Sequence, residues 1–132
     1  MVQVRIDEAA RWLVPGDLLI LAGVFAAGTV HHNGIAVLTT EPLYVAGTIL
    51  PFLIGWAVAG PLLGAYESRA VDSAHAAAVL AVRAWVLGAA IAVLIRASPL
   101  FSGGASPIFF AVTLGTGAAG LAIWRSVAVW LH

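Results

Sequence analysis

Four long apolar stretches, separated by short polar connections, set the pattern of this chain. They run from about Leu13 to Val30, Leu43 to Ala65, Ala76 to Ile95 and Ile108 to Leu131. Each supplies about the 20 apolar residues that an α-helix needs to cross a bilayer. Because hydrocarbon offers no hydrogen-bond partner to an open backbone, we expect all four stretches to be helices. The alternating pattern of a lipid-facing β-strand is absent, which argues against a barrel.

The connections carry the residues that end helices. Proline, glycine, serine, asparagine and charge concentrate in His31–Pro42, Tyr66–His75 and Arg96–Pro107, which is the chemistry of turns. No stretch resembles a separate soluble domain. The pattern therefore predicts an all-α polytopic membrane protein, with residues 1–132 forming a single four-helix transmembrane domain.

The N-terminal segment allows two interpretations. Met1–Trp12 is predicted to be a short amphipathic helix on the membrane surface, broken by Pro15-Gly16. The alternative is a secretory signal, in which basic residues, an apolar run and Ala26-Ala27-Gly28 would form the cleavage site. Asp7 and Glu8 are unusual in such a positively charged leader, so we favour the surface helix.

Composition narrows the class of protein. Hydrophobic residues make up 62% of the 132 residues and charged residues 9%, whereas a soluble domain has about 25% charged residues; the mean hydropathy is +1.04. This balance excludes a soluble enzyme, a disordered linker and a nucleic-acid binder, which needs a basic surface. The chain has no cysteine, which excludes disulfides, thiolate metal sites and a cysteine nucleophile.

The arginines predict the orientation. Arg5, Arg11, Arg69 and Arg125 lie on one side of the predicted membrane, and Arg96 lies on the other. By the positive-inside rule, both termini are expected on the cytoplasmic side of the cell membrane. The aromatic residues expected at the inner interface are Trp12, Tyr66, Trp124 and Trp130, and those at the outer interface are Tyr44 and Phe101.

Charged residues at membrane depth are the first candidates for a site. Asp17 opens the first helix, Arg83 lies one third of the way along the third, and Arg125 reaches the same layer from the fourth. Charge in hydrocarbon is costly unless it is paired. We therefore expect Asp17 to pair with Arg83 or Arg125, either as a lock between helices or as a substrate or proton site. The alternative is that Asp17 only favours the helix dipole at headgroup level.

Helix periodicity predicts which way two of the polar side chains face. At about 100° per residue, Asp17 shares a helix face with Val24, Gly28 and His31, and this face is expected to look inward. Arg96 points roughly 140° away from Arg83. If Arg83 faces the bundle, Arg96 is expected to face the external headgroups.

A metal site on the outer side is only weakly indicated. His31, His32 and Glu41 share one connection without a fixed ligand spacing. No metal is therefore predicted.

The second helix contains two prolines. Pro51 and Pro61 cannot donate to the carbonyls of Gly47 and Ala57, and we expect Thr48 or water to bind a freed carbonyl. Broken helices line sites in some transporters, although a plain kink is more common.

Small residues mark two faces for close packing. Gly60 and Gly64 have the spacing of the G-x-x-x-G packing motif. On the fourth helix, Thr113, Gly117, Gly120 and Trp124 form a smooth strip, which we expect to pack within the protomer or between protomers.

Several short motifs, in order, resemble a known family. They are Asp17 with Gly28-Thr29-Val30-His31, then Thr48–Trp56, then Arg96-Ala97-Ser98-Pro99-Leu100-Phe101, and finally Trp124-Arg125. Together they resemble the DUF3054 family of small four-helix membrane proteins, over nearly the whole chain. The resemblance implies the architecture and no reaction, because the family is of unknown function. His32 is a second histidine beside His31, and either could be the counterpart of the family's histidine.

No catalytic set is recognisable, and an enzyme is the least favoured class. We expect a non-catalytic accessory or structural subunit that docks a larger membrane protein, without a cofactor. The alternative is a minimal homo-oligomeric transporter or channel with a site near Asp17 and Arg83; its other candidate residues are His31, Thr48, Pro51 and Arg125. The expected partners are the lipid bilayer and either a second copy or a larger membrane protein, with no nucleic acid.

Overall fold

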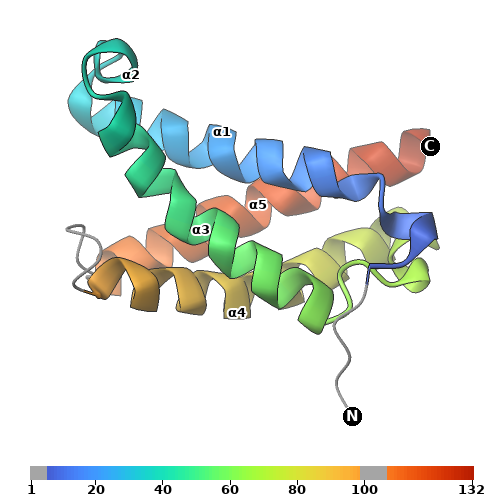
Figure 1. Ribbon diagram of the computed structural model, residues 1–132. Helices are drawn as coiled ribbons and strands as arrows, with labels where there is room; N and C mark the ends of the chain where they lie inside the picture. Colours follow the sequence, from blue (N-terminus) through green and yellow to red (C-terminus); the bar gives the residue numbers. More distant parts are fainter. Residues whose placement is uncertain (1–5, 99–106) are drawn as a thin grey trace.

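The computed structural model describes residues 6–98 and 107–132, and within these ranges it contains five α-helices and two short 3-10 helices. In chain order they are η1 (Glu8–Ala10), α1 (Leu13–Asn33), α2 (Val37–Thr40), α3 (Pro42–Leu62), η2 (Ser68–Val71), α4 (Ala74–Ala97) and α5 (Pro107–Leu131). The four long helices, α1, α3, α4 and α5, are apolar and long enough to span a membrane (Figure 1). The predicted all-α polytopic architecture is confirmed. The expectations for Arg5 and Phe101 fall outside the described residues.

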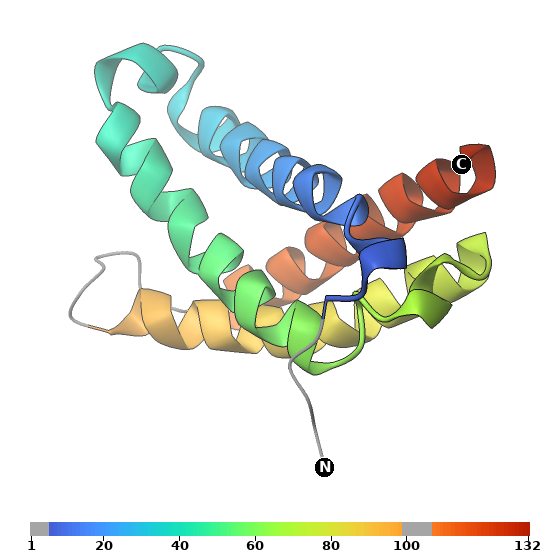
Figure 2. The ribbon, with the colours of Figure 1, turned by 45° about the vertical axis from the view of Figure 1, so that its right-hand side comes forward.

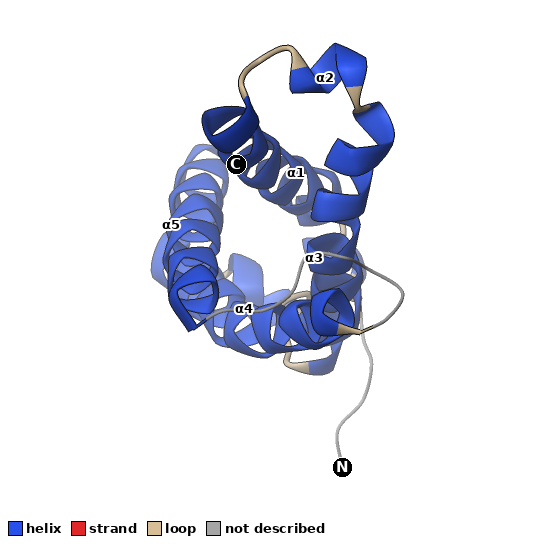
Figure 3. Cartoon of the chain, turned by 90° about the vertical axis from the view of Figure 1, so that its left-hand side faces the viewer, coloured by secondary structure: helices blue, strands red, loops and turns tan. Residues whose placement is uncertain are grey.

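The four long helices form a ring. α4 packs against both α3 and α5, and α1 packs against α3 and α5 on the opposite side (Figure 3). The C-terminus, η1 and the α3–α4 connection lie at one end of the molecule, which we call the terminal end. The short helix α2 lies at the other, here called the α2 end, together with the last turn of α4 and the first turn of α5 (Figures 1 and 2).

Two helices end at glycines with a positive φ. Gly34, at φ 85°, follows α1, which continues past its predicted end at Val30 to Asn33. Gly64, at φ 84°, follows α3, which stops at Leu62 before its predicted end at Ala65. Glycine populates this left-handed region without the steric cost that a Cβ imposes, so a glycine can fix the end of a helix independently of where the apolar run ends.

The predicted N-terminal surface helix is wrong in extent and in its break. Among the described residues before α1, which begin at Ile6, only Glu8–Ala10 is helical, and α1 runs through Pro15 and Gly16 without interruption. Proline is tolerated there because the first-turn N–H groups of a helix have no intrahelical acceptor. Asp7 fixes the segment to the α3–α4 connection: its N–H donates to the Tyr66 carbonyl at 2.8 Å, and its Oδ2 accepts from the Ser68 N–H at 2.8 Å.

The helices α3 and α4 touch at glycines other than those that the sequence predicted to pack. A Cβ at Gly55 would overlap the Gly88 carbonyl oxygen, so the two backbones touch there. Gly60 instead faces side chains, among them that of Tyr66, and Gly64 belongs to the turn after α3. The predicted packing role of the Gly60–Gly64 motif is therefore wrong.

The small-residue strip of α5 packs inside the protomer. A Cβ at Gly117 would overlap the Trp85 indole of α4, and one at Gly120 would lie 3.1 Å from Ile20 of α1. Of the two alternatives for this strip, the structure supports packing within the protomer. Farther along the strip, the indole of Trp124 fills the space left by Gly16 of α1.

The buried face of α1 differs from the predicted one. Its buried residues follow a spacing of four and are Leu13, Asp17, Leu21, Phe25 and Thr29. The prediction placed Val24, Gly28 and His31 on the inward face with Asp17, yet His31 and Gly28 are exposed. A stripe with a spacing of four drifts around the helix, because rows of residues four apart are inclined to the axis and guide helices that cross at an angle. The prediction assumed a stripe parallel to the axis.

Candidate functional site

A buried ion pair joins α1 to α5 near the terminal end. The Arg125 Nη2 atom lies 2.7 Å from Asp17 Oδ2, and Nε donates to Oδ1 at 3.0 Å. Both side chains are completely buried. This two-pronged geometry is the strongest that arginine and a carboxylate form. The predicted pairing of Asp17 with Arg83 or Arg125 is thus confirmed for Arg125, and headgroup exposure of Asp17 is excluded.

Tyr66 and Trp124 complete the shell of Asp17. The Tyr66 hydroxyl donates to Oδ2 at 2.5 Å, and the Trp124 indole N–H donates to Oδ1 at 2.9 Å. The Trp56 indole N–H in turn donates to the Tyr66 hydroxyl oxygen at 2.7 Å. Asp17 therefore accepts four hydrogen bonds, about as many as a carboxylate can hold. These five residues, Asp17, Trp56, Tyr66, Trp124 and Arg125, are called the Asp17 cluster below.

The rest of the Arg125 guanidinium binds backbone carbonyls. Its Nη1 atom donates to the Ala65 carbonyl at 2.9 Å and lies 3.4 Å from that of Ala77. Its central carbon lies 5.2 Å from the centre of the Tyr66 ring and 5.7 Å from that of Trp56, within the range of a cation–π interaction. The cluster therefore connects all four long helices at one level.

The protonation of Tyr66 follows from its surroundings. Burial, together with the negative charge of Asp17, raises the pKa of Tyr66 well above its ordinary value. The hydroxyl therefore remains protonated at physiological pH and serves as a donor. Tyr66, which the sequence predicts at the depth of the inner membrane interface, is 2% exposed and belongs to the hydrophobic core.

Arg83 does not join the cluster. Its side chain is exposed, and its Nη2 atom donates to the Leu63 carbonyl just after α3. Carbonyls at a helix C-terminus lack intrahelical donors and attract cations. The Arg83 alternative for the partner of Asp17, and with it the idea that Arg83 faces the bundle, is wrong.

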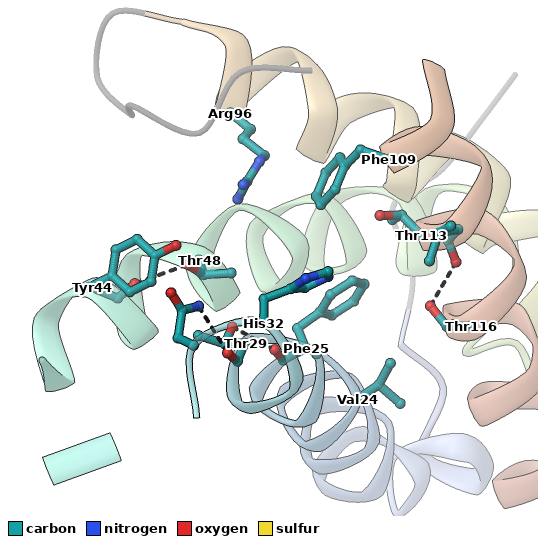
Figure 4. A pocket seen from close by; sticks show the side chains of 13 residues that line it. Val24, Phe25, Thr29, His32, Tyr44, Thr48, Arg96, Phe109, Thr113 and Thr116 are labelled. Carbon is teal, nitrogen blue, oxygen red and sulfur yellow. Dashed lines mark hydrogen bonds between the residues drawn. The ribbon is translucent and has the colours of Figure 1, made fainter. Parts of the chain in front are cut away.

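A second candidate site is a cavity at the α2 end, with a volume of about 370 Å³. All four long helices contribute to its lining, including Phe25 and Thr29 of α1, Thr48 of α3, Arg96 of α4 and Thr113 of α5. Figure 4 shows Arg96 reaching from α4 into the space between Phe109 and the start of α3, with His32 on the facing side. We call this the Arg96 cavity.

Arg96 points into the protein. The prediction that it faces the external headgroups is therefore wrong. Its guanidinium carbon lies 4.4 Å from the centre of the Phe109 ring. The prediction followed from the assumption that Arg83 faces the bundle. The two arginines do point in different directions, but Arg83 is the exposed one, so the assignment is reversed.

The remaining candidate residues are divided between the cavity and other places. His32 lines the cavity, whereas His31 is exposed and is not part of the lining. Thr48 also lines it, and its hydroxyl donates to the Tyr44 carbonyl at 3.0 Å, not to the carbonyl freed by proline. Pro51 is buried inside α3, which continues through both Pro51 and Pro61.

Three members of the Asp17 cluster were missed as site residues: Trp56, Tyr66 and Trp124. Aromatic residues near helix ends are typical of the interfacial belt, and Tyr66 and Trp124 were assigned to it. A usable signal was present, because a buried carboxylate needs donors besides one arginine. Aromatic N–H and O–H groups at the depth of Asp17 are suitable donors.

The four long apolar helices define a class of protein: an all-helical, multi-pass integral membrane protein. Within that class the assignment is specific. A model of the family described as "Protein of unknown function (DUF3054)" matches residues 14–128, so the chain belongs to the DUF3054 family. Neither a curated protein nor a solved structure matches the chain.

Proposed function

We propose that this chain is a non-catalytic membrane subunit, a rigid four-helix element that assembles with a larger membrane protein. The observation that supports this most directly is the state of the Asp17 cluster. Both charges have no exposed surface, and every acceptor position of Asp17 is occupied by a protein donor. A structural lock requires such a closed arrangement.

Transport through this cluster would require the opposite arrangement. An ion or proton site must exchange partners with water or solute during each cycle, and charged residues on such pathways usually face a water-filled cavity. Asp17 would have to release Tyr66, Trp124 or Arg125 before it accepted a proton. Each release would leave a buried donor unpaired, which costs about 1–3 kcal/mol, and more for the arginine.

The lock would hold the fold in the form that a partner recognises. Asp17 and Arg125 connect α1 to α5, and the Ala65 and Ala77 carbonyls add the α3–α4 connection and α4. The small-residue strip of α5 is used within the protomer, so the partner would contact the apolar outer faces of the helices. We place the protein in the cell membrane with both termini cytoplasmic, as the distribution of arginines favours.

One observation favours a second candidate, a homo-oligomeric transporter or channel. The Arg96 cavity provides a charged group facing an open space, which the Asp17 cluster does not. If the protein moves a solute, this cavity is a better candidate for the solute site than the neighbourhood of Asp17 and Arg83 that the sequence predicts.

The decisive experiment combines flux with complex isolation. The purified protein, reconstituted in liposomes, should be as silent as protein-free vesicles for proton and small-ion flux, and Asp17→Asn should behave likewise. After cross-linking in its own membrane, the chain should be recovered in a defined complex with one larger membrane protein. Flux that wild type supports and Arg96→Gln abolishes would replace the proposal with the transporter.

A further inference from the structure

The Arg96 cavity has the size of a small-ligand site. Its volume of about 370 Å³ lies at the lower end of the range of about 300–1,000 Å³ that such sites occupy. It lies toward the α2 end, where α3 and α4 diverge beyond the contact between Gly55 and Gly88 (Figure 2). Its lining residues come from all four long helices, α1, α3, α4 and α5.

The charge of the cavity is positive. Among the described residues that line it, Arg96 carries a permanent charge and none is acidic. The sequence has no acidic residue beyond Asp72, and Glu41, the acid of the α1–α3 connection, is exposed and is not part of the lining. A cationic cavity without a counter-charge selects for anions.

Part of the Arg96 guanidinium has no acceptor among the described residues. Within residues 6–98 and 107–132 its Nε atom is buried without a hydrogen-bond partner, and neither ion pair found in those ranges includes it. Its guanidinium rests on the ring of Phe109, which stabilises the charge but accepts no N–H···O bond. A buried N–H of a charged group strongly favours an oxygen acceptor. An anionic oxygen would supply it.

Three threonine hydroxyls of the lining already have an acceptor within the protein. The hydroxyls of Thr29, Thr48 and Thr116 already donate to carbonyls of their own helices. Beside them lie apolar surfaces, including those of Phe25 and Val112. A ligand that placed its anionic group at Arg96 would therefore lay an apolar portion against these apolar surfaces.

We infer that the Arg96 cavity binds an anionic amphiphile, with its carboxylate or phosphate group on Arg96 and an apolar chain between α1 and α5. The planar guanidinium would bind two oxygens of one group. Two sources have this chemistry, a free fatty-acid-like molecule and the headgroup end of an anionic phospholipid. The inference does not depend on the proposed function, because an accessory subunit and a transporter are both compatible with it.

The test uses the full chain in nanodiscs of phosphatidylcholine. Radiolabelled dodecanoate is the anionic probe, and dodecanol is its neutral counterpart. Arg96→Gln removes the charge and Arg96→Lys keeps it without the planar fork. Gly28→Leu narrows the cavity without touching the charge, since a Cβ at Gly28 meets no atom within 4 Å. The matched controls are Arg69→Gln, an exposed arginine at the terminal end, and Gly115→Leu, a glycine outside the lining.

The expected result is saturable binding of dodecanoate that exceeds that of dodecanol. Arg96→Gln and Gly28→Leu should each weaken it by about tenfold or more, and Arg96→Lys by less. Both controls should bind like wild type, and circular dichroism should show unchanged helicity in every variant. Equal binding of the two probes, or equal binding by wild type and Arg96→Gln, would overturn the inference.

A second arm separates the two sources of the ligand. Phosphatidylglycerol is added to the nanodiscs in place of part of the phosphatidylcholine. If it displaces dodecanoate from wild type, or protects the fold only when Arg96 is present, the site takes a lipid headgroup. If dodecanoate binds as before, the site takes a free amphiphile. Absence of Arg96-dependent binding in both arms rejects the site.

Discussion

At the scale of single residues, the Asp17 cluster shows how a membrane protein tolerates a fully buried charge pair. Removing two charges from water costs several kcal/mol each, and their mutual attraction offsets this only when the remaining hydrogen-bonding groups are also satisfied. Here Tyr66 and Trp124 satisfy the carboxylate, and backbone carbonyls satisfy the guanidinium. The cluster is therefore stable as a unit and sensitive to the loss of any member.

Removal of the negative charge is the most direct test of that unit. Asp17→Asn should lower the free energy of unfolding by about 3–5 kcal/mol, because it leaves Arg125 charged and unpaired in a buried site. Thermal unfolding followed by circular dichroism in mild detergent measures the change. The matched control is Arg83→Gln, an exposed side chain with one bond to a carbonyl, which should cost about 1 kcal/mol or less.

The same measurement tests whether Asp17 and Arg125 stabilise the fold as a coupled pair or independently. In the double variant Asp17→Asn with Arg125→Gln no charge is left unpaired, so its loss should be smaller than the sum of the two single losses. Strictly additive losses would contradict the lock.

Tyr66 makes a prediction about alkaline pH. Burial and the charge of Asp17 raise its pKa in the folded state, so folding favours the protonated hydroxyl. Its contribution to stability is fully present below about pH 10, the ordinary pKa of tyrosine, and is lost as pH rises beyond it. In a Tyr44→Phe background, where Tyr66 is the remaining tyrosine of two, near-ultraviolet absorbance should show no tyrosinate near pH 10 while the protein is folded.

The control for this titration is the same variant in denaturant, which should ionise near pH 10. Tyrosinate absorbance at that pH in the folded protein would mean that Tyr66 is not buried beside Asp17.

Prediction from the sequence succeeded where burial of a charge has a large energetic cost. It failed where the result depends on which way a side chain faces from its helix. The pairing of Asp17 followed from depth and charge alone. The choice between Arg83 and Arg125 did not, because it depends on the rotation of α4 about its own axis. Arg96 was misplaced for the same reason, since its predicted direction was defined relative to Arg83.

At the scale of helices, the distance between backbones decides which glycines matter. Gly55 lies against the Gly88 carbonyl, and a Cβ there has no space. The spacing motif at Gly60 and Gly64 predicted a contact that the structure does not form, because α3 ends between these two residues. Gly55 with Ala59, and Gly88 with Ala84 and Ala92, also have a small-residue spacing of four. The spacing alone does not tell which of several such patterns meets a neighbouring helix.

Substitution of these glycines should distinguish those at the contact between α3 and α4 from a glycine that touches no other helix. Gly55→Ala should destabilise the fold by about 1–3 kcal/mol, because α3 and α4 must move apart. Gly88→Ala should cost less, since a Cβ there lies 3.4 Å from the nearest atom, the Gly55 carbonyl oxygen. Gly47→Ala, on the same helix as Gly55 with nothing within 4 Å, should be neutral or stabilising by up to about 1 kcal/mol. Equal effects at Gly55 and Gly47 would contradict the close contact.

At the scale of the whole molecule, the four-helix architecture was predictable because the length of an apolar run is set by the thickness of the bilayer. The Arg96 cavity was not predictable. It exists because the helices cross and separate toward the α2 end. Along the sequence of α1, the crossing corresponds to the drift of the buried stripe from Leu13 to Thr29. The sequence determines that drift through side-chain packing, which no periodicity count along a single helix includes.

Orientation in the membrane is the prediction that belongs to this scale. Ser68 is exposed at the terminal end and Thr39 is exposed at the α2 end, and the chain has no cysteine of its own. With both termini cytoplasmic, a membrane-impermeant thiol reagent applied to intact cells should label Thr39→Cys and leave Ser68→Cys unlabelled until the membrane is permeabilised. The expected direction follows from the excess of arginine at the terminal end, which resists translocation. The reverse pattern would invert the protein. It would also place the Arg96 cavity on the cytoplasmic side, so that its anionic ligand would come from the inner leaflet or the cytosol.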